Sequence, residues 1–370
     1  MKRFWRNPLV YKEWKSVRWI TLLMTLSIFF TKIMEVMSSL KWIKEMETSG
    51  EIFGKLIIPK DFPIYIKHWF NQALLGYNNE TFVLSTIACL VILVVVLFRS
   101  ERQNKTYELL ASMPFKRKDI IVTKWYMGML SIFISSFIGF IALSVFYTSN
   151  IKYIQDSYSI VLRWSLLHMI MYMAIFTILF FIQTLMGQNI AGSVVGAIII
   201  LVPFFILSMI SSLIQVYMGL SWEDKIIRDI DTMAKNLNLY DLNRTEWIQV
   251  ANGKIREDLG YYGDHYFTYS NYNFKIIALL IIIAIFFALS IYAYKRNAFE
   301  KNGNLILFSA LEPAFKFGVA VCSGFLLSGI FGMGYADNNK IVIDIFLVIG
   351  AAAGYFTANK AIKICANSNK

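Results

Sequence analysis

Residues that could perform catalysis or bind a metal are few and scattered in this chain of 370 residues. The three histidines, His68, His168 and His265, lie far apart, and none has a second ligand at a metal-binding spacing. Methionines follow His168 at alternating positions, but such positions do not share a helix face, so we expect packing rather than a copper site. We therefore predict no catalytic residue and no metal site.

A phosphate-binding loop for a nucleotide needs two glycines at a fixed spacing followed by Lys and a hydroxyl residue. The nearest sequence is Gly50 followed by Gly54-Lys55-Leu56, which has the wrong spacing and lacks the hydroxyl. We expect this chain to bind no ATP and to have no enzymatic activity of its own.

Ionisable residues inside the apolar segments are also scarce. Lys32 and Glu35 stand at i, i+3 and are expected to neutralise each other near the headgroups, and Asp344 lies near a segment end. Secondary transporters usually keep such groups within their spans for ion coupling, so that class is disfavoured.

Composition indicates a membrane protein, since 57% of residues are hydrophobic and only 16% are charged. Several apolar runs of about 20 residues predict transmembrane helices. The net charge of +12 is explained by basic residues in the loops that stay inside. That face meets membrane lipid headgroups, so we expect no nucleic-acid partner.

The segment from Arg99 to Lys124 lies between two apolar runs and carries seven Lys/Arg against three acids. A short loop with this bias is expected on the cytoplasmic side. Residues 106–113 are predicted to form a two-turn helix, with Leu109, Leu110 and Met113 on one face, and Pro114 ends it. An ordinary basic loop is the alternative interpretation.

This segment resembles the coupling helix of ABC-2 type transporter permeases, with Lys105 in place of the usual glycine. The matching residues are Glu101, Thr106, Glu108, Leu109, Leu110, Ser112, Pro114, Arg117 and Ile121.

The resemblance implies a bacterial ABC exporter subunit, similar to permeases of the acetoin-utilisation and cell-envelope-stress type. It implies that Leu109, Leu110 and Met113 insert into a cytoplasmic ABC ATPase dimer, with Glu108 and Arg117 as rim charges. ATP and Mg would bind the ATPase, and this chain would carry no cofactor. A second permease chain, identical or homologous, would complete the transporter. The expected substrate is hydrophobic or amphipathic (a lipid, peptide or antibiotic).

The predicted fold is an all-α membrane protein with an N-terminal elbow helix and about eight spans, a six-span core plus a C-terminal hairpin. Both termini are expected to lie in the cytoplasm of a bacterial cell. The predicted parts are 1–18 (elbow helix), 19–98 (spans 1–2 with outside loop 38–81), 99–119 (coupling helix), 120–218 (spans 3–5), 219–273 (extracellular segment), 274–294 (span 6), 295–316 (cytoplasmic linker) and 317–370 (spans 7–8 and tail).

Two local features allow two interpretations each, and a third favours one. Residues 8–18 could be an interfacial elbow or a continuous extension of span 1. Arg163 could snorkel to the interface or face a substrate pathway. The small residues around Gly350 and Gly354 match a GxxxG pattern, which favours close packing of span 8 on span 7.

The extracellular segment is rich in aromatic residues, including Tyr266, Phe267, Tyr269 and Tyr272. They are expected to form an interfacial belt. A ligand-binding surface is the alternative, and it leads to a second functional hypothesis. On that hypothesis the chain is a membrane sensor or scaffold that binds an envelope ligand and transports nothing.

Overall fold

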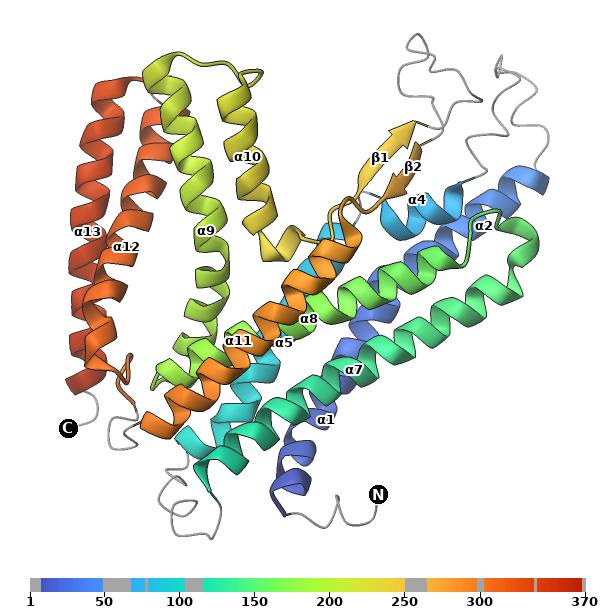
Figure 1. Ribbon diagram of the computed structural model, residues 1–370, viewed down its shortest axis with the longest axis horizontal. Helices are drawn as coiled ribbons and strands as arrows, with labels where there is room; N and C mark the ends of the chain where they lie inside the picture. The colour runs from blue at the N-terminus through green and yellow to red at the C-terminus, as the bar shows by residue number, and fades with distance from the viewer. Residues whose placement is uncertain are drawn as a thin grey trace. The chain divides into compact units, whose positions relative to one another are not determined.

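The structure is a computed structural model that describes residues 8–48, 68–76, 79–103, 116–249, 265–297, 303–335 and 338–367 (Figure 1). Within these ranges, eight helices are long and apolar enough to cross a membrane. The predicted all-α membrane fold is confirmed. A short antiparallel pair, β1 (Glu246–Gln249) with β2 (His265–Thr268), is the one ladder among the described residues.

The long helices follow the predicted spans closely. Span 1 comprises α1 (Pro8–Ile28), a π-helical stretch (Phe29–Ile33) and α2 (Met34–Thr48). The others are α5 (Asn79–Gln103), α7 (Arg117–Ser149), α8 (Ser159–Leu185), α9 (Asn189–Met218), α11 (Tyr272–Arg296), α12 (Glu312–Leu327) with its π-helical extension (Ser328–Tyr335), and α13 (Lys340–Asn367). The shorter helices are α4 (Trp69–Leu75), α10 (Lys225–Leu237) and the 3-10 turns Ile151–Tyr153, Leu239–Asp241 and Ser309–Leu311.

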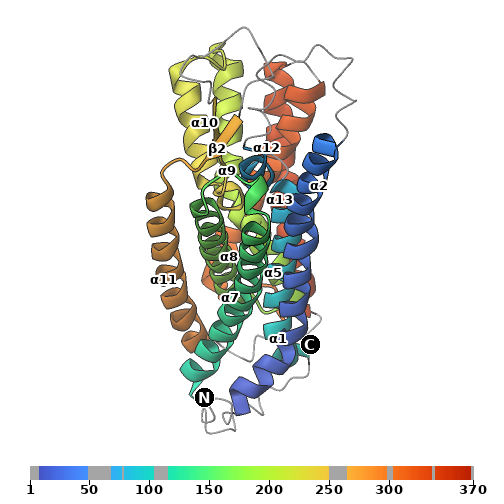
Figure 2. The same ribbon diagram turned by 90° about the vertical axis from the view of Figure 1, so that its right-hand side faces the viewer.

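The N-terminal residues form no separate elbow helix. Pro8 begins α1, which runs without interruption to Ile28 and then through the π-helical stretch into α2 (Figure 2). Val10, Val17 and Met24 are buried along one face of this helix. The predicted elbow at residues 8–18 is therefore corrected to its alternative, an extension of span 1. The apolar stripe of these turns continues in register into the span, so nothing in the sequence breaks the helix.

Two compact units make up the chain. The first comprises Met1–Leu93, Tyr126–Ala174 and Asn243–Ile282, and the second comprises Val94–Trp125, Ile175–Leu242 and Ile283–Lys370. Helices α5, α7, α8 and α11 each contribute to both.

In the first unit, Lys32 and His168 are enclosed by protein, whereas Arg163 is exposed. Lys32 pairs with Glu35 at 3.2 Å as predicted, but its side chain is 0% exposed, so the chain itself rather than the headgroup layer surrounds it. His168 is buried as a packing residue, with Nδ1 2.8 Å from the carbonyl of Trp164. Arg163 is exposed, with its guanidinium 5.9 Å from the ring of Tyr272.

In the second unit, the hairpin of α12 and α13 packs through small residues, as the GxxxG pattern predicted. A Cβ at Gly350 would lie 2.6 Å from the carbonyl oxygen of Ser323 and 2.9 Å from the Cα of Gly324. A Cβ at Gly354 would meet the carbonyl oxygen of Val319 at 2.9 Å. Only glycine allows the two backbones to approach this closely.

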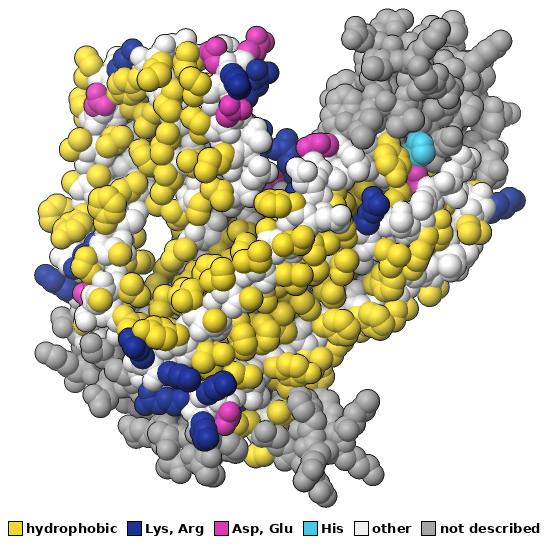
Figure 3. Space-filling model, in the orientation of Figure 1, with side chains coloured by type: hydrophobic (Ala, Val, Ile, Leu, Met, Phe, Trp, Pro, Cys, Tyr) yellow, Lys and Arg dark blue, Asp and Glu magenta, His cyan; other side chains and the backbone are white. Residues whose placement is uncertain are grey.

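Most of the visible surface over the spans is hydrophobic (Figure 3), as expected for helices that face lipid. Lys and Arg side chains gather where α11 ends and α7 begins. We call this region the basic end, and its described residues are Arg99, Lys116, Arg117, Lys118, Lys295 and Arg296.

Candidate functional site

Most of the predicted docking residues, namely Thr106, Glu108, Leu109, Leu110, Met113 and Pro114, lie outside the described residues. The structure does describe the helices on both sides of them. Glu101 lies in the last turn of α5, and Arg117 is the first residue of α7. The candidate site is therefore the attachment of residues 104–115 to these two helices.

Lys124 joins the two helices just beyond this segment. Its side chain is 0% exposed, and its Nζ donates a hydrogen bond to the main-chain carbonyl of Leu97 at 2.5 Å. The ammonium also lies 5.6 Å from the ring of Phe98. Burial of an ammonium is costly unless hydrogen bonds and aromatic contacts replace its water, and both are present here. Lys124 thus fixes α7 against α5.

Arg117 joins the start of α7 to the end of α11. Its Nη1 donates to the carbonyls of Lys295 (3.3 Å) and Asn297 (3.0 Å). The last carbonyls of a helix lack partners within it and carry partial negative charge, so a guanidinium stabilises them. The predicted role of Arg117 at the rim of a docked partner stays a prediction, but the residue has this bond within the chain.

Aromatic contacts complete the attachment. The indole of Trp125 stacks on Phe287 with ring centroids 4.0 Å apart, and its Nε1 donates to Thr177 Oγ1 at 3.2 Å. Phe98 contacts Phe180 at 5.1 Å. Helices α5, α7, α8 and α11 are therefore packed together next to the segment.

The turn between α8 and α9 is held to the same helices by side-chain amides. Gln183 Nε2 donates to both the main-chain and side-chain oxygens of Asn189, each at 3.0 Å. Asn189 Nδ2 in turn donates to the carbonyl of Val95 in α5 at 2.9 Å. Ser193 Oγ donates to Gln183 Oε1 at 3.2 Å. These bonds pair every buried amide group of the turn, which favours a single rigid arrangement.

Residues 19–298 match the family model described as ABC-2 family transporter protein. The chain belongs to the ABC-2 transporter family. The predicted family is thus confirmed, and the chain is a multi-pass membrane permease of the ABC-2 type. No curated protein and no solved structure matches it significantly. Helices α12 and α13 lie beyond the matched residues, in agreement with the predicted extra hairpin.

A second polar cluster of the permease lies near the C-terminal end of α7, in the first unit. His68 Nδ1 is 2.6 Å from Asp156 Oδ1, and the other carboxylate oxygen accepts the N–H of Asn71 at 2.9 Å. The side chain of Asn71 also donates to the carbonyl of Phe267 and accepts its N–H, at 2.9 and 2.7 Å. Burial, together with the nearby Asp156 carboxylate, raises the pKa of Tyr266 beside His68.

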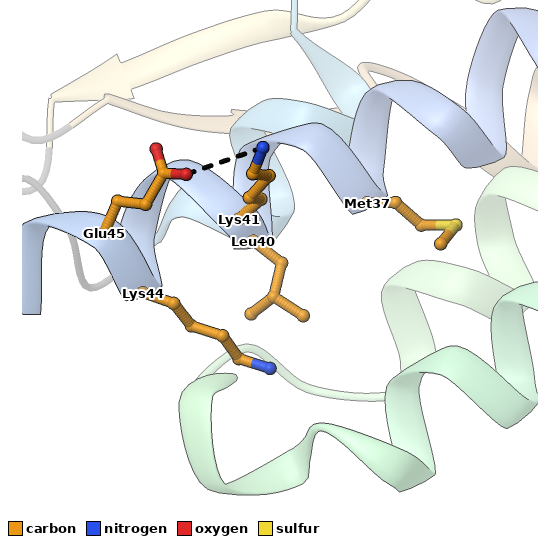
Figure 4. A pocket seen from close by; sticks show the side chains of 5 residues that line it. All are labelled: Met37, Leu40, Lys41, Lys44 and Glu45. Atoms are coloured by element: carbon orange, nitrogen blue, oxygen red, sulfur yellow. Dashed lines mark ion pairs between the residues drawn. The ribbon is translucent and has the colours of Figure 1, made fainter. Parts of the chain in front are cut away.

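One hollow of about 390 Å³ lies along α2, lined by Met37, Leu40, Lys41, Lys44 and Glu45 (Figure 4). Lys41 pairs with Glu45 at 3.6 Å, and the Lys44 ammonium lies 4.9 Å from the ring of Tyr153. These charged groups therefore interact with other residues of the same chain. Nowhere in the described ranges do three or more His, Cys, Asp or Glu come together as metal ligands.

Sequence reasoning missed Lys124, Trp125 and Asn189 as site residues. Lys124 has the composition of a loop charge in the sequence, and its bond is to the Leu97 carbonyl, 27 positions away. Asn189 follows Gly187-Gln188 in a short turn, and its hydrogen bond to Val95 joins residues far apart in the sequence.

Proposed function

We propose that this ABC-2 permease is the membrane subunit of a bacterial exporter driven by a separate ABC ATPase dimer. The basic end would lie in the cytoplasm, as the excess of Lys and Arg favours. Residues 106–113 would dock on the ATPase through Leu109, Leu110 and Met113. A second permease chain, the same or homologous, would complete the translocation pathway.

One observation carries the proposal: the helices that flank the docking segment are bound to each other and to α11. Lys124 bonds to the Leu97 carbonyl, and Arg117 bonds to the carbonyls of Lys295 and Asn297. Because these helices are bonded to one another, a force applied to the docking segment would act on all three of them. Closure of the ATPase on ATP would therefore displace α5, α7 and α11 together. This movement would change the side of the membrane to which the translocation pathway is open.

The substrate class follows from the surface of the spans. They are apolar, and few ionisable groups interrupt them, which suits a lipid, a hydrophobic peptide or an amphipathic antibiotic. ATP and Mg would bind the partner, and the permease itself would have no enzymatic activity.

The sensor alternative depends on the aromatic residues of the predicted extracellular segments. Among the described residues, Asn71 forms hydrogen bonds with Asp156 and with Phe267, so these polar groups are paired within the chain. This arrangement favours a structural role for the cluster and therefore favours the transporter.

Co-purification with the ATPase tests the proposal. We expect Leu110→Glu to reduce the amount of ATPase recovered with the permease at least tenfold, because it places a charge in an apolar contact. Ala111→Glu, on the opposite side of the predicted helix, is the matched control and should retain the ATPase. Full recovery of the ATPase with Leu110→Glu, in a correctly inserted permease, would contradict docking at this segment.

A further inference from the structure

Helix α11 carries an exposed apolar stripe that ends in a cation. The stripe consists of Ile285, Leu289, Tyr292 and Arg296, which follow one another at spacings of four, three and four and therefore share one face of the helix. The three apolar side chains are 51%, 40% and 55% exposed, and Arg296 is exposed as well. In a transmembrane helix, a face of this kind lies against lipid chains or another apolar helix.

The length of the stripe matches one leaflet of a membrane. Ile285 and Arg296 lie eleven positions apart, which is about 16 Å along the helix axis. Half of a hydrocarbon core of about 30 Å is about 15 Å. When Arg296 lies among the headgroups, the apolar residues of the stripe therefore extend to about the middle of the membrane, as one acyl chain does.

The guanidinium of Arg296 is oriented by the stripe itself. It lies 4.4 Å from the centroid of the Tyr292 ring, one helical turn away. This cation–π contact uses the face of the guanidinium, whereas an anion binds to the N–H groups at its edge. In the part of the chain that the structure describes, no acidic side chain pairs with Arg296.

Other cations surround Arg296. Lys295 is exposed and has no ion pair with a described residue. Arg117 donates to the carbonyls of Lys295 and Asn297, so the start of α7 lies beside the end of α11 and brings further positive charge (Figure 3). Asp119 is the one acid among residues 116–119 at the start of α7. The basic end therefore has an excess of positive charge, which attracts anions.

We propose that Lys295 and Arg296 bind the phosphate of an anionic phospholipid and that one of its acyl chains lies along Tyr292, Leu289 and Ile285. A guanidinium can donate two parallel N–H bonds to a phosphate, and the neighbouring ammonium adds a point charge. A zwitterionic lipid would bring its own ammonium into a positive region, which is unfavourable. A free phosphate ion would make no use of the apolar stripe.

The bound lipid would lie next to the attachment of the docking segment, because the carbonyl of Lys295 also accepts a hydrogen bond from Arg117. Its assignment to the cytoplasmic leaflet rests on the proposed function. The site itself does not, since the same residues are present in either orientation of the permease.

Lipid titration of the purified full chain, followed by native mass spectrometry, tests the site. The probe is dioleoyl phosphatidylglycerol, and dioleoyl phosphatidylcholine, which has the same acyl chains, is the reference. We expect the first phosphatidylglycerol to bind at least fivefold more tightly than the first phosphatidylcholine. Lys295→Gln combined with Arg296→Gln should reduce this preference to less than twofold.

Lys360→Gln combined with Lys363→Gln is the matched control. It removes the same charge from two exposed positions near the end of α13, and we expect it to keep the preference. Both residues of the test variant are exposed, so the substitutions remove no buried contact. Arg296→Gln alone should give at least a twofold loss if the double variant is not inserted.

Four results would overturn the proposal. Equal affinity of the wild-type chain for the two lipids would show that the site does not select an anion. Equal losses in the two double variants would mean that positive charge anywhere at this end attracts the lipid. Displacement of the lipid by millimolar inorganic phosphate would show that the acyl chain contributes nothing. Loss of a permease dimer with unchanged lipid binding would assign the stripe to a second chain. The titration contains no ATPase, so a failure of docking at Leu110 leaves its outcome unchanged.

Discussion

The ammonium of Lys124 in α7 donates a hydrogen bond to the main-chain carbonyl of Leu97 in α5. The two residues lie on either side of residues 104–115, the segment that we propose to dock the ATPase. The lysine is completely buried, so this hydrogen bond is shielded from water. Water would compete with the same bond at an exposed site. It is the clearest physical link between the docking segment and the spans.

Lys124→Met should uncouple ATP hydrolysis from transport while the ATPase stays bound. Methionine keeps the apolar stem but loses a hydrogen bond from a charged donor, which is worth about 1.5–3 kcal/mol. We expect stimulation of ATP turnover by the permease to fall at least threefold in reconstituted vesicles. Lys118→Met, at an exposed site on the same helix, is the control. Wild-type turnover and transport with Lys124→Met would argue against this link.

Arg117→Lys should behave like Arg117→Ala in the same assay. The guanidinium reaches two carbonyls, those of Lys295 and Asn297, whereas an ammonium is a single point of charge on a flexible stem. We expect both variants to lower coupled turnover by a similar factor of about two to five, since the site is exposed and each bond is weak. A lysine variant with full activity would show that only the charge matters.

Gly350→Ala should destabilise the α12–α13 hairpin. The added Cβ would lie 2.6 Å from a backbone oxygen, and backbone atoms cannot move aside as a flexible side chain does. Overpacking of this kind costs about 1–3 kcal/mol. Gly318→Ala is the matched control, because a Cβ there meets nothing within 4 Å and alanine favours helix. The midpoint of thermal unfolding should fall for the first variant only, and equal midpoints would refute the packing described here.

Asn71→Ala should destabilise the contact between α4 and β2. It leaves the N–H and carbonyl of Phe267 without the two bonds that the amide now supplies, at a cost of roughly 2–4 kcal/mol. Asn71→Asp should also lower the stability of this contact, because a carboxylate has no N–H to donate to the Phe267 carbonyl. A lower thermal midpoint for both variants is the expected outcome, and unchanged midpoints would mean that water replaces the amide.

The spans were predictable because their signal is local. Runs such as Ile120–Tyr147 need no distant partner to be recognised, and the structure places α7 at Arg117–Ser149. The GxxxG contact was predictable for the same reason. The bond from Lys124 to Leu97 was not predictable. The sequence around a lysine near a loop is the same whether its side chain faces water or bonds to a distant carbonyl. The packing of α10 along α9 was not predicted, because the sequence shows an apolar stripe on this helix but not which helix that stripe contacts.

The most direct test of the central claim is photo-crosslinking from position 110. A benzophenone amino acid in place of Leu110, in intact cells that contain the ATPase, should form an adduct with the ATP-binding subunit. The same residue in place of Ala111 should give at least fivefold less of this adduct. Adducts with lipid alone, or reaction of a cysteine at position 110 with an impermeant reagent added outside the cell, would contradict the account.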